Sequence, residues 1–231
     1  MSDIEDDFVF IREIGKGNYA SVFLAESKEN CQKFAVKRIQ KSRISTMTNG
    51  IKSIVREIDI MRKLDHPNIV KLYNVYESDS EICLVLDYLE GGNLYERINR
   101  KKKFSEAIIR AFAIKFFGVL CYLDSMHIVH RDIKLENILL SSKLNDYEFK
   151  LADFGIADYC KENLSLRCGS PGYIAPEILR KEVYDTKADV FSIGVVLYIL
   201  FCGKMPFFGT SVDEILLKNR ECHVHFYDFE W

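Results

Sequence analysis

Hydrophobic and polar residues alternate over roughly the first ninety positions of the chain, as they do in β-strands that bury one face. Glycine or polar turns separate these runs, which is the usual punctuation between strands. The strand-like runs are 8–15, 20–27, 33–39, 69–76 and 82–88. The pattern predicts a small antiparallel sheet in this part of the chain.

One segment among these runs has helical spacing. In residues 53–64, Ile54, Ile58 and Met61 recur at offsets of three and four, which predicts a helix with one apolar face. Pro67 follows and ends it, because proline lacks a backbone donor and restricts the residue before it. We therefore expect the sheet to carry one helix.

Beyond Gly91 and Gly92 the pattern becomes mainly helical. Residues 104–126 and 187–202 are apolar almost all round, which is typical of helices buried in a core. Short strands and loops lie between them. The sequence predicts an α+β chain with a small sheet lobe, a larger helical lobe, a boundary near 87–93 and a cleft between the lobes.

Composition is that of an ordinary soluble globular protein. The 231 residues are 48% hydrophobic and 29% charged, and the net charge of -2 lacks the basic surplus of a nucleic-acid binder. The apolar stretch 190–202 is too short to span a bilayer, and the acidic N-terminus lacks the plan of a signal peptide. The seven cysteines form no C-x-x-C pair, which fits a reducing compartment. We expect no nucleic-acid or membrane partner, and a cytoplasmic or nuclear location.

The most informative segment is HRDIKLEN at 130–137, followed by a DFG tripeptide that begins at Asp153. Asp132 supplies a base and Lys134 a cation, while Asn137 and Asp153 supply oxygen ligands suited to Mg²⁺. Taken singly, each residue has an ordinary explanation as a loop cap, a solvated charge or part of a turn. All four in this order favour phosphoryl transfer.

A weaker signal is GKGNYASV at 15–22, between two predicted strands. Gly15 and Gly17 would let backbone N–H groups approach phosphates, although Ala20 stands at the third position of the G-x-G-x-x-G pattern. A glycine-containing hairpin turn is the alternative explanation. A dinucleotide-binding fingerprint is excluded, because the segment leads into a strand and not a helix.

Residues 35–39 form a predicted strand in which Ala35 and Lys37 face the same way. A small residue beside a lysine leaves room for a planar base and offers a cation to a phosphate. Glu57, on the predicted helix, is the candidate partner of Lys37. Either charge alone would be ordinary solvated surface, but together they would form a positioning pair.

In order, these motifs give the chain a recognisable resemblance. From Phe8 to its last residue it resembles a eukaryotic protein kinase catalytic domain, with Gly-rich loop, A-V-K, helix Glu, H-R-D, D-F-G and A-P-E. Lys134 and the segment CGSPGYIAPE (168–177) resemble serine/threonine kinases. That segment and GGNLYERI (91–98) are most similar to the calcium/calmodulin-dependent and AMP-activated group.

The resemblance implies a two-lobed protein-kinase-like fold and an enzyme that transfers the γ-phosphate of ATP, with Mg²⁺, to Ser/Thr hydroxyls of protein substrates. The alternative is a nucleotide-binding scaffold that is catalytically weak or inactive because the domain is truncated. The implied organisation is an acidic tail at 1–7 and a kinase domain at 8–231, with N-lobe 8–86, hinge 87–92 and C-lobe 93–231.

It also implies roles for single residues. Lys37 would contact the α- and β-phosphates beside Glu57. Asp132 would be the catalytic base, with Lys134 balancing the charge of the transferred group. The implied metal ligands are Asn137 and Asp153, and the implied ATP contacts are Ile14, Gly15, Lys16, Gly17, Asn18, Val22, Ala35, Lys37, Leu86, Asp87, Leu89, Asn93, Leu139 and Asp153. Supporting residues would be Met61, Leu72, His130 and Phe154 as a spine, Ser170 at the substrate loop, Asp189 as a brace for the catalytic loop, and Glu136 as a contact for a basic residue before the target hydroxyl.

Two departures from the family pattern stand out. Leu166 occupies a position where relatives in this group often carry an activating threonine, so activity is expected not to depend on phosphorylation there. Ser165 is the candidate substitute, with Arg131 as its phosphate partner. The chain also stops within an aromatic cluster at Trp231, so we expect a fragment in which Glu177 lacks the arginine that normally pairs with it.

Overall fold

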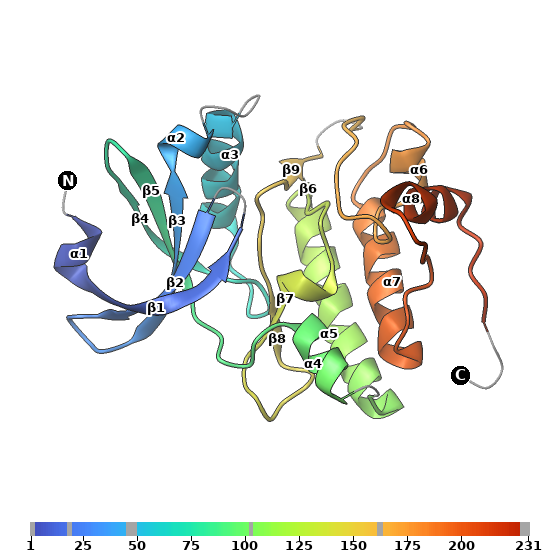
Figure 1. Ribbon diagram of the computed structural model, residues 1–231, viewed down its shortest axis with the longest axis horizontal. Helices are drawn as coiled ribbons and strands as arrows, with labels where there is room; N and C mark the ends of the chain where they lie inside the picture. The colour runs from blue at the N-terminus through green and yellow to red at the C-terminus, as the bar shows by residue number, and fades with distance from the viewer. Residues whose placement is uncertain (1–2, 18–19, 45–49, 102–103, 161–163, 227–231) are drawn as a thin grey trace. The chain divides into compact units, whose positions relative to one another are not determined.

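The computed structural model describes residues 3–17, 20–44, 50–101, 104–160 and 164–226. The chain forms two compact units, Met1–Asp65 with Val70–Tyr88 and His66–Ile69 with Leu89–Trp231. Figure 1 labels their elements. No helix in the described part of the chain combines the length and apolar character needed to cross a membrane.

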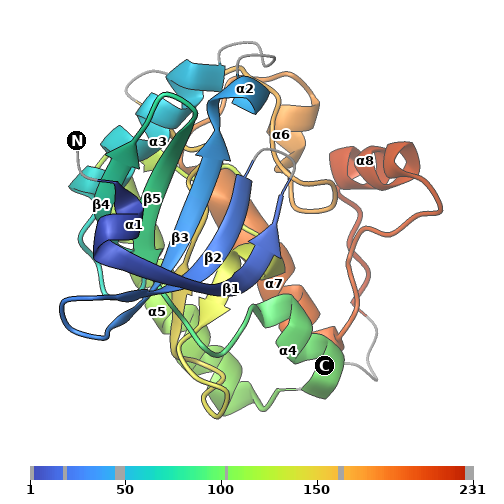
Figure 2. The ribbon, with the colours of Figure 1, turned by 60° about the vertical axis from the view of Figure 1, so that its left-hand side comes forward.

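The first unit is built on a five-stranded sheet in the order β1-β2-β3-β5-β4, with every neighbouring pair antiparallel. The strands are seen side by side in Figure 2. They are β1 (Phe8–Lys16), β2 (Ala20–Ser27), β3 (Lys33–Gln40), β4 (Leu72–Glu77) and β5 (Glu81–Asp87), and the helices are α1 (Ile4–Asp7), α2 (Lys41–Ile44) and α3 (Gly50–Lys63). The predicted antiparallel sheet with a helix is confirmed.

Side-chain alternation gives the sheet two different apolar faces. On one face Val36 packs with Ile4 of α1. On the other face Ile39 packs with Ile54 of α3. Lys37 lies two residues before Ile39 on the same strand and therefore points to the face that α3 covers.

The N-terminal segment, expected as an acidic tail, contains a short helix at residues 4–7. Its N-cap is Asp3, whose side chain accepts a hydrogen bond from the backbone of Glu5. The Asp6 carboxylate accepts a hydrogen bond from the backbone N–H of Asp3, which completes a capping box. Ile4 is only 4% exposed, so its burial holds this turn against the sheet.

The second unit is mainly helical, and α5 and α7 lie side by side in it (Figure 1). The predicted apolar helix at 187–202 is confirmed with those bounds, and the predicted helix at 104–126 is α5. The helices are α4 (Leu94–Lys101), α5 (Glu106–Ser125), α6 (Pro176–Leu179), α7 (Lys187–Cys202) and α8 (Val212–Glu221), with a 3-10 turn at Leu135–Asn137. The rings of Phe112, Phe116 and Phe149 pack together in its core.

Two short strand pairs hold the loops of the second unit. They are β6 (Ile128–Val129) with β9 (Asp158–Tyr159), and β7 (Ile138–Leu140) with β8 (Phe149–Leu151), all antiparallel. Ile69, expected at the start of a strand, instead bridges Leu151 in this unit, and β4 begins at Leu72. The turn at His66–Asn68 redirects the chain before the strand can start.

Candidate active site

The first turn of α7 holds the loop that follows β6 in place. Asp189 accepts hydrogen bonds from the backbone N–H groups of His130 at 2.7 Å and Arg131 at 2.9 Å. Its carboxylate is buried, and that burial raises its pKa. Arg131 has a φ of +67°, a strained value that these bonds help to maintain. The predicted bracing role of Asp189 therefore corresponds to observed contacts.

Four of the predicted residues make contacts at the loop that Asp189 holds: Asp132, Lys134, Asn137 and Ser170. Lys134 Nζ donates to Asp132 Oδ2 at 2.8 Å and contacts Ser170 Oγ at 2.8 Å. The Ser170 hydroxyl donates to Asp132 Oδ1 at 2.7 Å. Asn137 Nδ2 donates to the backbone oxygen of Asp132 at 2.9 Å and to Oδ2 at 3.2 Å. Both carboxylate oxygens of Asp132 are thus oriented by named donors.

Asn137 and Asp153 lie at the same end of the β7–β8 hairpin. The N–H of Ala152 donates to the carbonyl of Asn137 at 2.8 Å, and Ile138 pairs with Leu151 next to it. Asp153 follows with a φ of +64°. The Asn137 amide nitrogen is a donor and bonds to Asp132, so the atom that the side chain offers to a cation is its oxygen.

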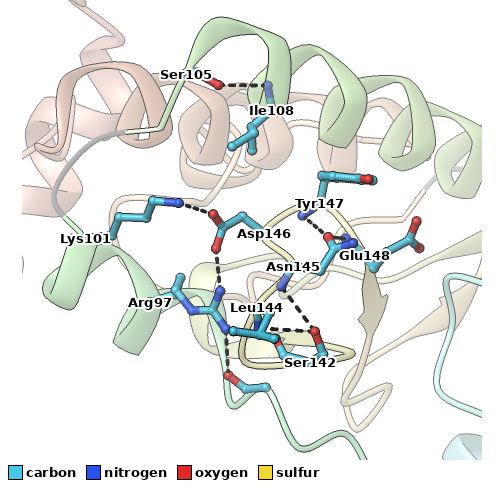
Figure 3. Close-up of polar contacts among 11 residues, drawn as sticks. Arg97, Lys101, Ser105, Ile108, Ser142, Leu144, Asn145, Asp146, Tyr147 and Glu148 are labelled. Carbon is cyan, nitrogen blue, oxygen red and sulfur yellow. Dashed lines mark hydrogen bonds and ion pairs between the residues drawn. The ribbon is translucent and has the colours of Figure 1, made fainter.

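Contacts from α4 fix the other end of this hairpin, as Figure 3 shows. Asp146 forms ion pairs with Arg97 and Lys101, and Arg97 also donates to the backbone oxygen of Ser142 at 2.9 Å. Burial alone would raise the pKa of Asp146, but the hydrogen bonds from Lys101 and Arg97 outweigh it and lower the pKa. The hairpin that ends at Asn137 and Asp153 is therefore anchored at its turn.

In the first unit the predicted pair is formed. Lys37 Nζ lies 2.6 Å from Glu57 Oε1, and the Glu57 side chain is only 5% exposed. The register places Gly15 opposite Val22 and Val22 opposite Lys37. Ala35 is buried on the same face of β3 as Lys37. The sheet therefore brings Lys37, Ala35 and the glycine segment at Gly15 into one region.

Gly15 of the predicted glycine segment lies on β1, and Gly17 N donates to the carbonyl of Ala20, the first residue of β2, at 2.8 Å. Asp87, at the end of β5, accepts from the N–H of Lys71 and from the hydroxyl of Tyr73. Of the other predicted ATP contacts, Ile14 and Lys16 lie on β1, Leu86 lies on β5, Leu89 begins the main segment of the second unit, and Asn18 lies outside the described residues.

Asn93 and Leu139 meet in the second unit through an antiparallel bridge. The side chain of Asn93 also accepts from the N–H of Glu96 at the start of α4. Two of the four predicted spine residues, His130 and Phe154, are also in contact there, with ring centroids 4.7 Å apart. Met61 and Leu72 belong to the first unit.

The sequence did not point to the partners that Arg131 has in the structure. Its guanidinium contacts Ile156 O, Asp158 and the Tyr184 hydroxyl. These residues follow it at separations of 25 to 53 positions, with no periodic pattern linking them. The sequence carries no signal for these contacts; it is the burial of Arg131 in the structure that requires partners for its charge.

Comparison with known proteins finds one family over nearly the whole chain. A family model described as protein kinase domain matches residues 8–230. Myosin light chain kinase A of Dictyostelium discoideum is 37% identical over 100% of this chain and 78% of its own length. Probable serine/threonine-protein kinase 2 of Plasmodium falciparum is 36% identical over 97% of this chain, and calcium-dependent protein kinase 5 of Plasmodium berghei is 43% identical over 90%. The chain spans only 43% and 37% of the lengths of those two relatives.

Proposed function

Because the chain belongs to the protein kinase domain family, of the serine/threonine type, we propose that it transfers the γ-phosphate of ATP to Ser and Thr hydroxyls of protein substrates. The proposal rests on the Asp132 carboxylate, to which an aliphatic hydroxyl, that of Ser170, already donates at 2.7 Å. A substrate hydroxyl presented to this carboxylate would make the same kind of bond. The carboxylate would orient the attacking hydroxyl oxygen and accept its proton as the γ-phosphate passes to that oxygen and ADP leaves.

Lys134 would stabilise the negative charge that develops on the transferred phosphoryl group. Its ammonium group is within 2.8 Å of both Asp132 and Ser170, so it lies where the hydroxyl and the transferred group would meet. A cation held in place before the reaction stabilises negative charge without reorganising at the moment of transfer. Asn137 fixes the loop by binding the backbone oxygen of Asp132.

Asn137 and Asp153 would hold the metal ion, and the donor set fits Mg²⁺. Both offer oxygen, which Mg²⁺ prefers, and both sit at one end of the anchored hairpin. No group of three or more His, Cys, Asp or Glu that could hold a metal occurs within the described ranges. A two-residue site is what substrate phosphates and waters would complete. When bound, the ion would neutralise phosphate charge and orient the γ-phosphate.

Lys37 would bind the α- and β-phosphates, with Glu57 keeping the ammonium in place. The carboxylate is buried enough that it needs the lysine as a counter-charge. The further nucleotide contacts that we propose in the first unit are Ile14, Gly15, Lys16, Gly17, Asn18, Val22, Ala35, Leu86 and Asp87, and those in the second unit are Leu89, Asn93 and Leu139.

The substrate preference that we propose is a basic residue before the target hydroxyl. Glu136 is exposed and lies between the ligand Asn137 and the cation Lys134 in sequence. An exposed carboxylate two residues from Lys134 would attract a cationic side chain of the substrate.

Transfer of labelled γ-phosphate to a basic peptide with one serine, in the presence of Mg²⁺, tests the function. Matched peptides carry alanine or tyrosine at that position and should remain unlabelled. Asp132→Asn should reduce the rate about 10²–10⁴-fold, the usual cost of removing a general base. Asp213→Asn, at an exposed aspartate of the same unit, should leave the rate unchanged.

Equal rates for Asp132→Asn and wild type would overturn the role of Asp132. Binding of ATP without any transfer by the wild-type chain would favour the nucleotide-binding scaffold instead. Labelling of the tyrosine peptide alone would overturn the serine/threonine assignment.

A further inference from the structure

Arg131 is a buried cation directly before Asp132. Its side chain is only 4% exposed. A guanidinium removed from water is strongly destabilised unless its donors are paired. Nε donates to the backbone oxygen of Ile156 at 2.6 Å, and the two terminal nitrogens lie 3.4 Å from the Tyr184 hydroxyl and 3.2 Å from Asp158 Oδ2. Every nitrogen of the guanidinium therefore has a partner within the chain.

The counter-charge is fixed by strand register. Asp158 belongs to β9 and pairs with Val129 of β6, two residues before Arg131. Its Oδ1 accepts from the N–H of Tyr159 at 2.9 Å, and its Oδ2 faces the guanidinium. A backbone bond thus orients the carboxylate toward Arg131.

Tyr184 ties a later segment to the same cation. Its backbone N–H and C=O exchange hydrogen bonds with Leu164, each at 3.0 Å, and its hydroxyl donates to the backbone oxygen of Leu166 at 2.8 Å. Burial raises the pKa of Tyr184 to about 12, so the hydroxyl stays protonated at neutral pH. A chain of contacts runs from Arg131 through Tyr184 to Leu166, four residues before Ser170.

We propose that Asp158 is the built-in counter-charge of Arg131, and that Asp158 and Tyr184 are positioning residues for the reaction. They hold residues 156–160 and 164–170, here called the anchored segment, against the loop that carries Asp132. They do so without a phosphate group on the anchored segment. In kinases whose loop is ordered by phosphorylation, the new phosphate acts by pairing with arginine. Here that arginine already has a carboxylate, and Leu166 has no hydroxyl to modify. The inference rests on the proposed kinase function.

The test uses the full chain, co-expressed with a protein phosphatase and shown to be free of phosphate by intact mass. Two readouts are taken: kcat on the serine peptide, and the rate of trypsin cleavage after Arg167, an exposed residue within the anchored segment. The second readout needs no catalytic activity. It reports how often the segment opens.

The phosphate-free wild type should be as active as chain purified without phosphatase. Asp158→Asn should lower kcat about 10²-fold, as small misplacements of catalytic groups do, with KM for ATP unchanged. It should also speed cleavage about tenfold. Tyr184→Phe should shift both readouts in the same directions by less, Asp158→Glu should restore both, and Asp213→Asn should change neither.

Loss of activity and of protease resistance in the phosphate-free wild type, with both regained on phosphorylation of Ser165, would overturn the proposal. So would an Asp158→Asn protein that behaves like Asp213→Asn. If Asp158→Asn fails to fold, Tyr184→Phe decides whether the proposal holds. An unchanged kcat and an unchanged cleavage rate in that variant would contradict the positioning role of the contacts from Arg131 through Tyr184 to Leu166. If no form transfers phosphate but the cleavage contrast holds, the positioning stands and the kinase function is refuted.

Discussion

The two groups of side chains proposed to act in phosphate transfer are built in different ways. In the second unit, hydrogen bonds to Asp132 join it to Lys134, Asn137 and Ser170. Asp189 holds the backbone of the same loop at His130. In the first unit, Lys37 on β3 meets Glu57 on α3 across 20 positions of sequence. The cluster is determined by several contacts at once, whereas the pair depends on how a helix packs on a sheet.

The difference predicts different responses to substitution. Oδ2 of Asp132 accepts from Lys134 and Asn137, and Oδ1 accepts from Ser170, so the loss of Ser170 leaves both donors to Oδ2 in place. The Lys37–Glu57 contact joins a strand to a helix, so removing the lysine cation removes this contact. Lys37→Met and Ser170→Ala test this difference directly, and Asp146→Asn tests the anchor of the hairpin next to Asn137.

Lys37→Met has the largest expected effect of the three. It should lower kcat/KM for ATP about 10²-fold, because a preorganised charge aimed at phosphate is lost. Steady-state kinetics over a range of ATP concentrations measure this. Lys33→Met, at an exposed position at the start of the same strand, is the matched control. Equal kcat/KM for the two variants would contradict the role of Lys37.

Asp146→Asn tests the anchor of the second unit and should destabilise the fold by about 2 kcal/mol at neutral pH. It leaves the Arg97 guanidinium, whose side chain is 10% exposed, without its counter-charge. Since the folded-state pKa of Asp146 lies below the ordinary 3.8, the stabilising contribution is present above that pH. It is lost as the pH falls through the folded-state pKa.

Urea unfolding of wild type and Asp146→Asn across acidic pH measures this difference. The two stability curves should be separated at neutral pH and converge in strong acid. Glu106→Gln, which breaks an exposed ion pair on α5, should cost no more than about 0.5 kcal/mol. A difference that grows as the pH falls would show that Asp146 is not held as the charged form.

Ser170→Ala should have the smallest effect, a decrease in kcat of about fivefold, the value of one hydrogen bond. Lys134 still contacts Asp132 Oδ2 in this variant, so the loop keeps its shape. Peptide phosphorylation at saturating ATP measures the rate. Ser165→Ala is the control and should be indistinguishable from wild type. A loss for Ser170→Ala as large as that for Asp132→Asn would mean that the cluster is not redundantly held.

Local patterns predicted much of this architecture. The strand alternation gave the sheet, and the all-round apolar run at 187–202 gave α7 with its bounds, because both signals lie within one element. The spacing inside 130–137 likewise placed Asp132, Lys134 and Asn137 together, since a short loop cannot separate them. The position of Glu57 could also be predicted, because helical periodicity places it on the face of the helix that meets the sheet.

Contacts between distant and chemically ordinary residues were not predictable. Asp158 and Tyr184 are common residue types, and nothing in their neighbourhood marks them as partners of Arg131. Asp146 sits in a polar loop where a solvated turn is the natural interpretation, yet α4 buries it. These partners depend on tertiary packing, which sequence periodicity does not encode.

The most direct test of the central claim is to measure ATP affinity and phosphoryl transfer on the same preparation of Asp132→Asn. Asp132 is proposed to act on the hydroxyl and not on the nucleotide. We therefore expect an ATP affinity within about twofold of wild type, together with transfer that is slower by about 10²–10⁴-fold. Transfer at the wild-type rate, or loss of ATP affinity in proportion to the loss of rate, would contradict it.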